Sequence, residues 1–161
     1  MKVEALFGLS VLMSFLAFAI VTKLYILPRL RVMRREDALV PLVVPHTFRF
    51  VGLSFLVPGV VSPSLSSAFA APAAYGDLVA TILAIIATLA LSARAAWAIA
   101  MVWAFNVWGT VDLLNAIYQG QIDRIGPGSF GAAFFIPTLV VPALLVTHAL
   151  IFWLLLKPRK R

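Results

Sequence analysis

The sequence predicts an all-α polytopic membrane protein, in which residues 1–161 form a single domain built as a bundle of five transmembrane helices. The first observation behind this prediction is composition: 63% of the residues are hydrophobic and only 12% are charged. Soluble domains are about 45–50% apolar and about 25% charged, so an ordinary soluble fold and a disordered chain are both excluded. The chain has no cysteine, which excludes a disulfide scaffold or a thiolate zinc site.

The second observation is a series of apolar runs long enough to cross a bilayer, which takes about 20 helical residues. The runs cover approximately residues 4–26, 38–61, 76–93, 96–118 and 131–156. If 76–118 were a single helix it would be about 64 Å long, roughly twice the membrane, and Arg94 would lie in lipid. We therefore expect two helices separated by a turn near Arg94. The runs lack two-residue alternation, so strands are not expected.

The third observation is the distribution of positive charge, which predicts the orientation of the helices. With five spans, ten basic residues fall on one side: Lys23, Arg29, Arg31, Arg34, Arg35, Arg94, Lys157, Arg159, Lys160 and Arg161. Lys2 and Arg124 fall on the other side. The positive-inside rule then places the N-terminus outside the cell and the C-terminus in the cytoplasm. We expect the protein to lie in the plasma (inner) membrane. These charges serve orientation and contact with anionic lipid, so we expect no nucleic-acid partner despite a net charge of +7.

The segments between the runs are expected to be loops without domains of their own. Residues 58–74 are rich in Pro, Ser and Ala, and residues 119–130 are rich in Gly and Pro. The acidic residues Glu4, Asp77 and Asp123 are expected on the outer side. The first apolar run is too long for the core of a cleaved signal peptide, so we expect it to be retained as a helix.

Few polar residues fall inside the spans, and these are the candidates for function, because a polar group in hydrocarbon must be paired or must face the bundle interior. The second span contains His46 and Arg49, the fourth contains Asn106, Asp112 and Asn115, and the fifth contains Thr147 and His148. From these, and from one aromatic residue near them, we select six candidate ligand-binding residues: His46, Arg49, Trp108, Asp112, Asn115 and His148.

The two histidines lie at matched depths, each about 12 Å from the cytoplasmic end of its helix. Two histidines on different helices at one depth could be the axial ligands of a b-type haem, or could share a proton. The alternative is that each ring caps a proline-loosened turn or bonds to a backbone carbonyl. No metal cluster is predicted.

Arg49 is the most costly residue to bury in a bilayer. One interpretation is an ion pair with Asp112 that fixes helix packing, and another is that Arg49 holds an anionic group such as a carboxylate or a lipid phosphate. A third is that the second span begins later, which would place Arg49 at the interface.

The fourth span has one face with an aromatic and polar stripe, made of Trp97, Met101, Trp108, Asp112 and Asn115 at helical spacing. Asn106 lies on the opposite side. The stripe is typical of a packed core, but it could also line a pocket for an amphipathic molecule.

Prolines interrupt the two spans that carry the histidines, with Pro41, Pro45 and Pro58 in the second and Pro137 and Pro142 in the fifth. Backbone carbonyls freed by proline must find partners or line a cavity. We therefore expect a polar cavity between these two spans, open toward the cytoplasmic half.

The leading functional hypothesis is a membrane protein, receptor-like or a transport component, that binds a small amphipathic or anionic ligand within the bundle. The first alternative is a haem b protein with His46 and His148 as axial ligands. The second is a structural or accessory subunit of a larger membrane complex. Signatures of enzymes are absent from the sequence, so an enzyme is the less favoured class. Expected partners are membrane lipids, the ligand, and a second copy of the chain in a homo-oligomer.

Overall fold

The computed structural model describes residues 1–157, and the structure over this range is helical without strands. The first long segment joins α1 (Val3–Val21), the π-helical turn η1 (Thr22–Ile26) and α2 (Leu27–Val32), and the second joins α3 (Arg35–Val43) to the 3₁₀ helix η2 (Val44–Leu56). The predicted basic cluster at Arg159, Lys160 and Arg161 lies outside the described residues.

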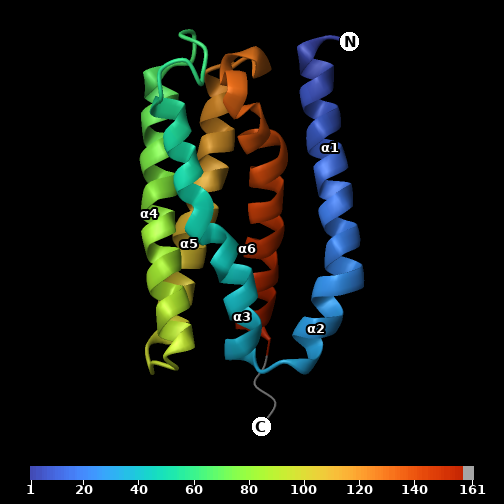
Figure 1. Cartoon of the computed structure of the whole chain (residues 1–161), viewed down its shortest axis with the longest axis vertical. Coiled ribbons are helices and arrows are strands. Elements are labelled where there is room, and N and C mark those ends of the chain that lie inside the picture. The colour runs from blue at the N-terminus through green and yellow to red at the C-terminus, as the bar shows by residue number, and fades with distance from the viewer. Residues whose placement is uncertain (158–161) are drawn as a thin grey trace.

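The second half of the chain is formed by α4 (Ser67–Ser92), α5 (Ala98–Ile122), the short η3 (Pro127–Phe134), the π-helical turn η4 (Ile136–Val140) and α6 (Val141–Leu156). In Figure 1 the long segments run side by side, with the N-terminus at one end of the molecule and the end of α6 at the other.

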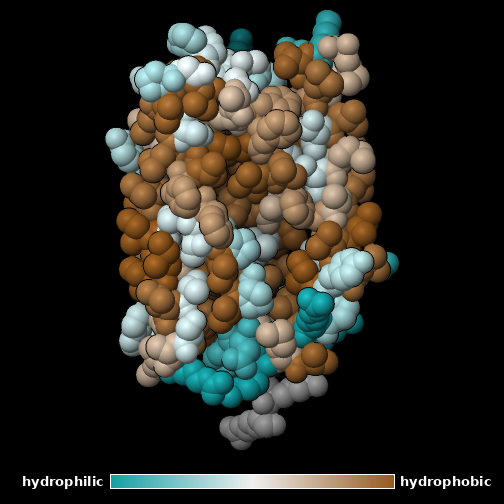
Figure 2. Space-filling view, viewed as in Figure 1, coloured by the Kyte–Doolittle hydropathy of each residue, from teal (hydrophilic) through white to brown (hydrophobic). Residues whose placement is uncertain are grey.

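Within the described residues, four helical segments are long and apolar enough to cross a membrane. They are Val3–Val32, Arg35–Leu56, Ser67–Ser92 and Ile136–Leu156. The helix α5 has comparable length, but it carries Asn106, Asp112 and Asn115 and is not among these four. Figure 2 shows an apolar band around the middle of the molecule and a hydrophilic patch at the end near the C-terminus.

The helix α4 begins earlier than the hydropathy of the sequence predicts, at Ser67 instead of near residue 76. The Oγ of Ser66 accepts a hydrogen bond from the backbone N–H of Ala68 and so caps the helix. Residues 67–74, which we expected to be loop, therefore form the first two turns of α4. As a consequence Asp77 lies inside a helix and is buried, so the expectation that it lies on the outer surface is wrong.

The 3₁₀ helix η2 extends over 13 residues, whereas most such helices are only three or four residues long. Its turn has three residues, so side chains three positions apart are eclipsed. His46, Arg49, Gly52 and Phe55 follow this spacing, and all four are buried. In an α-helix, residues three positions apart lie about 60° from each other around the axis, whereas the observed 3₁₀ geometry aligns His46 and Arg49 in one column facing the bundle.

The buried face of α5 is not the tryptophan face that the sequence suggested. Asn106 is fully buried, whereas Trp108 is 46% exposed and Asn115 is exposed. The inward face carries mostly small or medium side chains, namely Ala98, Val102, Phe105, Asn106, Gly109 and Leu113. Small side chains let helices approach closely. Phe105 is the one aromatic ring on this face, and Trp97 and Trp108 are left on the outer surface.

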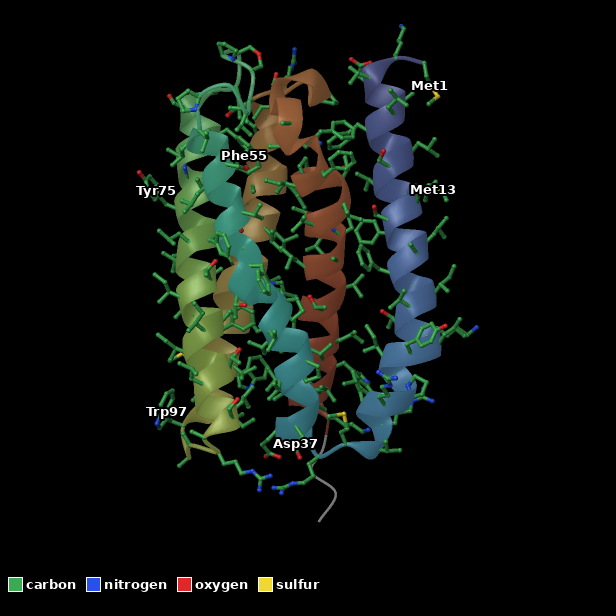
Figure 3. All side chains as sticks on the ribbon, viewed as in Figure 1. Met1, Met13, Asp37, Phe55, Tyr75 and Trp97 are labelled. Atoms are coloured by element: carbon green, nitrogen blue, oxygen red, sulfur yellow. The ribbon has the colours of Figure 1, made fainter. Side chains whose placement is uncertain are left out.

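The first helix stands apart from the other long segments. The helix α1 packs mainly against α6 and η4, and contributes a single buried residue, Ser14. Figure 3 shows Met13 on the side of α1 that faces away from the bundle and Tyr75 on the outer side of α4. A cavity lies between α1 and the remaining helices.

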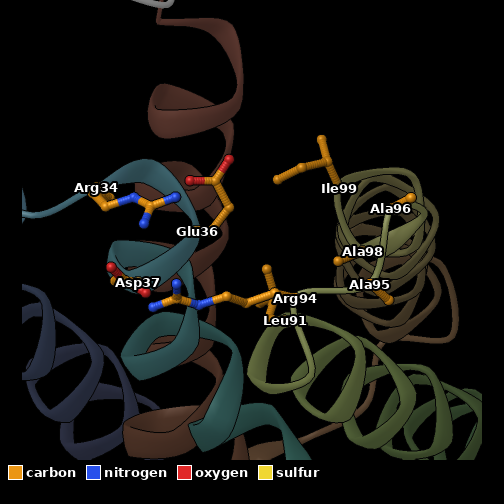
Figure 4. Close-up of a pocket in the computed structure, with 9 residues that line it drawn as sticks. All are labelled: Arg34, Glu36, Asp37, Leu91, Arg94, Ala95, Ala96, Ala98 and Ile99. Atoms are coloured by element: carbon orange, nitrogen blue, oxygen red, sulfur yellow. The ribbon is translucent and has the colours of Figure 1, made fainter.

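The end of the molecule near the C-terminus is charged. A pocket of about 240 Å³ lies there between the start of α3 and the α4–α5 turn, and four of its lining residues are Arg34, Glu36, Asp37 and Arg94. In Figure 4 the Arg94 side chain extends from the turn toward the start of α3. Arg94 has a φ of 52°, a conformation that ends α4 sharply and permits the short turn predicted at this point.

Candidate functional site

Arg49 is the centre of a buried polar cluster that joins η2, α4, α5 and α6. Its residue is 1% exposed. The Nε donates to Asp77 Oδ1 at 2.7 Å, and Nη2 lies 2.7 Å from the same oxygen and donates to Asp112 Oδ2 at 2.6 Å. The Nη1 donates to the carbonyl of Gly109 at 3.2 Å and to His148 Nε2 at 3.3 Å. These five contacts match the five N–H groups of the guanidinium.

The cluster lies close to the middle of the helices. Asp77 is ten residues from the start of α4 and Asp112 is ten residues from the end of α5, so each is about 15 Å from the outer end of its helix. A hydrocarbon core is about 30 Å thick, and this depth corresponds to its midplane in a bundle that spans it.

The hydrogen bonds of His148 fix its protonation pattern. A guanidinium has only donors, so Nε2 of His148 must accept from Arg49. The opposite ring nitrogen, Nδ1, then carries the proton and donates to Asn106 Oδ1 at 2.7 Å. The Asn106 amide in turn donates to the backbone carbonyl of His148 at 3.3 Å. His148 is therefore a neutral ring that positions Arg49.

His46 lies next to His148, with ring centroids 4.2 Å apart. Its Nε2 is 2.9 Å from the hydroxyl of Thr147, which donates to backbone carbonyls one turn earlier in α6 and so accepts from His46. The other nitrogen, Nδ1, is buried with no hydrogen-bond partner among the described residues.

Three glycines on three helices make room for the cluster. A Cβ on Gly52 would lie 2.1 Å from Asp77 Oδ2, and one on Gly76 would lie 1.8 Å from Asp112 Oδ1. A Cβ on Gly109 would lie 2.7 Å from His148 Cε1 and 2.8 Å from Arg49 Nη1. Each polar side chain thus occupies the space that a larger residue at the glycine would fill.

A cavity of about 550 Å³ reaches the cluster from the end of the molecule where α1 and α4 begin, between α1 and the rest of the bundle. Its outer part is lined by Glu4, Gln121 and Pro127, and its inner end includes Asp77 and Asp112. Five phenylalanines line it, namely Phe7, Phe15, Phe55, Phe69 and Phe130. Among the described residues no lysine or arginine lines this cavity, so its charged groups are carboxylates.

Four of the six candidate residues come together in the structure: His46, Arg49, Asp112 and His148 all belong to the cluster. The ion pair between Arg49 and Asp112 is confirmed as a contact. Trp108 and Asn115 lie elsewhere, on the exposed side of α5, where the Trp108 indole donates to the carbonyl of Gly76 at 3.4 Å. The observed cavity lies between α1 and the bundle, toward the end where α1 begins, and not between the second and fifth expected spans.

The six residues selected from the sequence do not include Asp77 or Asn106, although Asn106 was identified as a polar residue inside the fourth span, and the role of Gly76 was not foreseen. Asp77 was expected at the outer end of its helix because the preceding residues are small and weakly apolar, but the cap at Ser66 and the alanines after it were available as a helix signal. The pattern of small residues on one face of α5 could have identified Asn106 as buried.

The sequence matches a family model over residues 6–156, and that family is described as a domain of unknown function (DUF8737). The chain belongs to this family. No curated protein and no solved structure matches the sequence. The matched range of the DUF8737 domain includes the whole cluster and most of the cavity lining, from Phe7 to Leu145.

The two histidines of this DUF8737 domain are not arranged as axial ligands of a haem. Their ring centroids are 4.2 Å apart, which leaves no space for an iron porphyrin between the rings. Both Nε2 atoms already have partners, Thr147 for His46 and Arg49 for His148. The geometry favours a hydrogen-bonded pair that supports the ion cluster.

Proposed function

We propose that the protein is a plasma-membrane protein of five transmembrane helices that binds a small amphipathic molecule in the cavity between α1 and the bundle. The observation that carries the proposal is a cavity of about 550 Å³ with an apolar wall and two carboxylates at its inner end. Ligand sites are typically mostly apolar spaces of about 300–1,000 Å³ with a few placed polar groups.

The five-span arrangement is supported by α5, which runs alongside the four candidate spans with similar length. It buries Asn106, and its Asp112 pairs with the buried Arg49. A short turn, from residue 93 to 97, joins it to α4. The excess of basic residues at the end containing Arg34 and Arg94 supports an external N-terminus and a cytoplasmic C-terminus.

The polar end of the ligand is expected to meet Asp77 and Asp112. Arg49 faces the carboxylates from the other side and uses all five N–H groups within the protein, so it has no free donor for an anion. Of the two ligand classes expected from the sequence, this arrangement supports the amphipathic molecule and does not support an anion bound by Arg49.

Photolabelling tests the site directly. We expect a neutral long-chain alcohol bearing a diazirine to label α1 and α5 of the purified full chain at cavity-lining positions such as Val11 and Ala116. Ala116→Trp fills the cavity and should remove the labelling. Ala104→Trp is the matched control, because Ala104 is exposed on the same helix. Labelling confined to the outer surface, unaffected by Ala116→Trp, would contradict the proposal.

A further inference from the structure

The charges of the buried cluster do not balance. Asp77 and Asp112 together carry two negative charges when ionised, and Arg49 carries one positive charge. His148 accepts from Arg49 and is neutral, and His46 hydrogen-bonds to Thr147 and to neither carboxylate. At the outer part of the same cavity Glu4 adds a further acidic group. The titratable and charged groups around the cavity are thus Glu4, His46, Arg49, Asp77, Asp112 and His148.

An uncompensated charge at the middle of a membrane costs several kcal/mol. Two simple species can remove it: a proton on one carboxyl group, or a cation placed beside the two carboxylates. The cluster can hold one or the other, since either one brings its formal charge to zero.

Asp112 is the better candidate for the exchangeable position. Asp77 Oδ1 accepts a hydrogen bond from the Arg49 Nε and also lies 2.7 Å from Nη2, whereas Asp112 contacts Nη2 alone. Both carboxylates line the inner end of the cavity. Phenylalanine rings from α1, η2, α4 and η3 lie along the approach to them, and aromatic faces attract organic cations.

We propose that the cavity takes a monovalent organic cation with an apolar body, and that this cation replaces a proton on Asp112. This inference rests on the proposed ligand site and names its ligand class. In this exchange the protonated Asp112 loses its proton to the solvent, and the resulting carboxylate pairs with the bound cation. No electron is transferred and no covalent bond other than O–H is broken.

The ammonium headgroup of a lipid is not a suitable source of the cation. A lipid headgroup remains in the interface, whereas Asp112 lies about 15 Å from the outer end of its helix. The ligand must therefore be a whole molecule that enters the cavity, with its charge at the inner end.

The test uses two ions of the same shape and opposite charge, tetraphenylphosphonium and tetraphenylborate. Binding to the full chain in neutral maltoside micelles is measured by equilibrium dialysis, with protein-free micelles subtracted. We expect tetraphenylphosphonium to bind and tetraphenylborate not to bind. The affinity for the cation should increase by up to tenfold per pH unit over the range where Asp112 is protonated, because a proton competes with it.

A weakly buffered solution with a pH-sensitive dye should report about one proton released per cation bound in that range. Asp112→Asn resembles the protonated acid in shape and charge, so it should fold, bind the cation at least tenfold more weakly and release no proton. Asp123→Asn is the matched control, because Asp123 is an exposed carboxylate that does not line the cavity. It should release protons as the natural chain does.

The possible failures are distinguishable. Cation binding without proton release, with an affinity that does not change with pH, would overturn the exchange. Preferential binding of tetraphenylborate would overturn the ligand class and leave the cavity as a binding site. Absence of binding by both ions, together with cavity labelling by the neutral photoprobe, would overturn the inference and leave the proposed function intact.

Discussion

At the scale of single residues, the cluster depends on having a partner for each polar atom. A guanidinium offers five donors in a plane, which a lysine cannot reproduce with its single ammonium group. Arg49 therefore joins two carboxylates, one imidazole and one backbone carbonyl at once. Removing one member leaves others buried without a partner, which costs more than the bond itself contributes.

The two asparagines of α5 test whether the loss of one hydrogen-bond partner destabilises the buried cluster. Asn106 bonds to both the ring and the backbone of His148, whereas Asn115 is exposed. Asn106→Leu leaves His148 Nδ1–H unpaired, so we expect a loss of about 1–3 kcal/mol in the free energy of unfolding.

Asn115→Leu is the control and should change stability by less than about 0.5 kcal/mol. Unfolding of the detergent-solubilised protein, followed by circular dichroism against sodium dodecyl sulfate, measures both variants. Equal effects of the two substitutions would show that Asn106 does not support the cluster.

At the scale of elements, the close approach of helices depends on glycines placed opposite polar side chains. Gly76 and Gly109 each occupy a position where a Cβ would collide with the cluster, whereas a Cβ on Gly8 in α1 would meet nothing within 4 Å. The helices α4, α5 and η2 can therefore pack only if these positions stay small.

We predict that Gly76→Ala and Gly109→Ala each lower the thermal unfolding midpoint by several degrees, because Asp112 or the Arg49–His148 pair must move. Gly8→Ala is the matched helical control, and it should be neutral or stabilising by up to about 1 kcal/mol because alanine favours a helix. The measurement is thermal unfolding in detergent. An unchanged midpoint in both cluster variants would mean that the helices adjust freely around the added methyl group.

The sequence predicts an element well where hydropathy or charge defines its ends, and poorly where small residues or an unusual helical period do. Four of the five apolar runs coincide with helices that are long and apolar enough to cross a membrane, and the turn at Arg94 is confirmed. Both follow from the large and local cost of burying charge in lipid. The start of α4 was placed late because alanine and serine carry little hydropathy even when they are helical. The column from His46 to Phe55 could not be predicted from an α-helical period, since tertiary packing selects the 3₁₀ form here.

Part of the candidate site was predictable, because polar residues are rare inside apolar runs and therefore stand out in the sequence. Polar residues inside apolar runs identified His46, Arg49, Asp112 and His148, which the structure brings together. The choice of a face on α5 failed, because a stripe of large aromatic residues was taken as inward-facing. In a membrane bundle the inward face is the one with small residues, and the large apolar side chains face lipid.

At the scale of the whole molecule, the central question is how many times the chain crosses the membrane. The positions of α4, α5 and their connecting turn imply that Arg94 and Ser129 lie at opposite ends of the bundle. If α5 crosses the membrane, these two residues are on opposite sides. If it does not, they are on the same side and the positive-inside assignment fails.

The absence of cysteine in the chain allows a direct measurement, since each introduced cysteine is the single thiol. We predict that Ser129→Cys and Ser64→Cys react with a membrane-impermeant maleimide on intact cells, because both lie at the outer end near the start of α4 and η3. Arg94→Cys should react only after the membrane is permeabilised. Reaction of Arg94→Cys and Ser129→Cys from the same side would exclude a crossing by α5. The charge cluster would then no longer lie at the midplane of the membrane. Its unbalanced charge would carry no large free-energy cost, and the reason to expect a bound cation or proton would be removed.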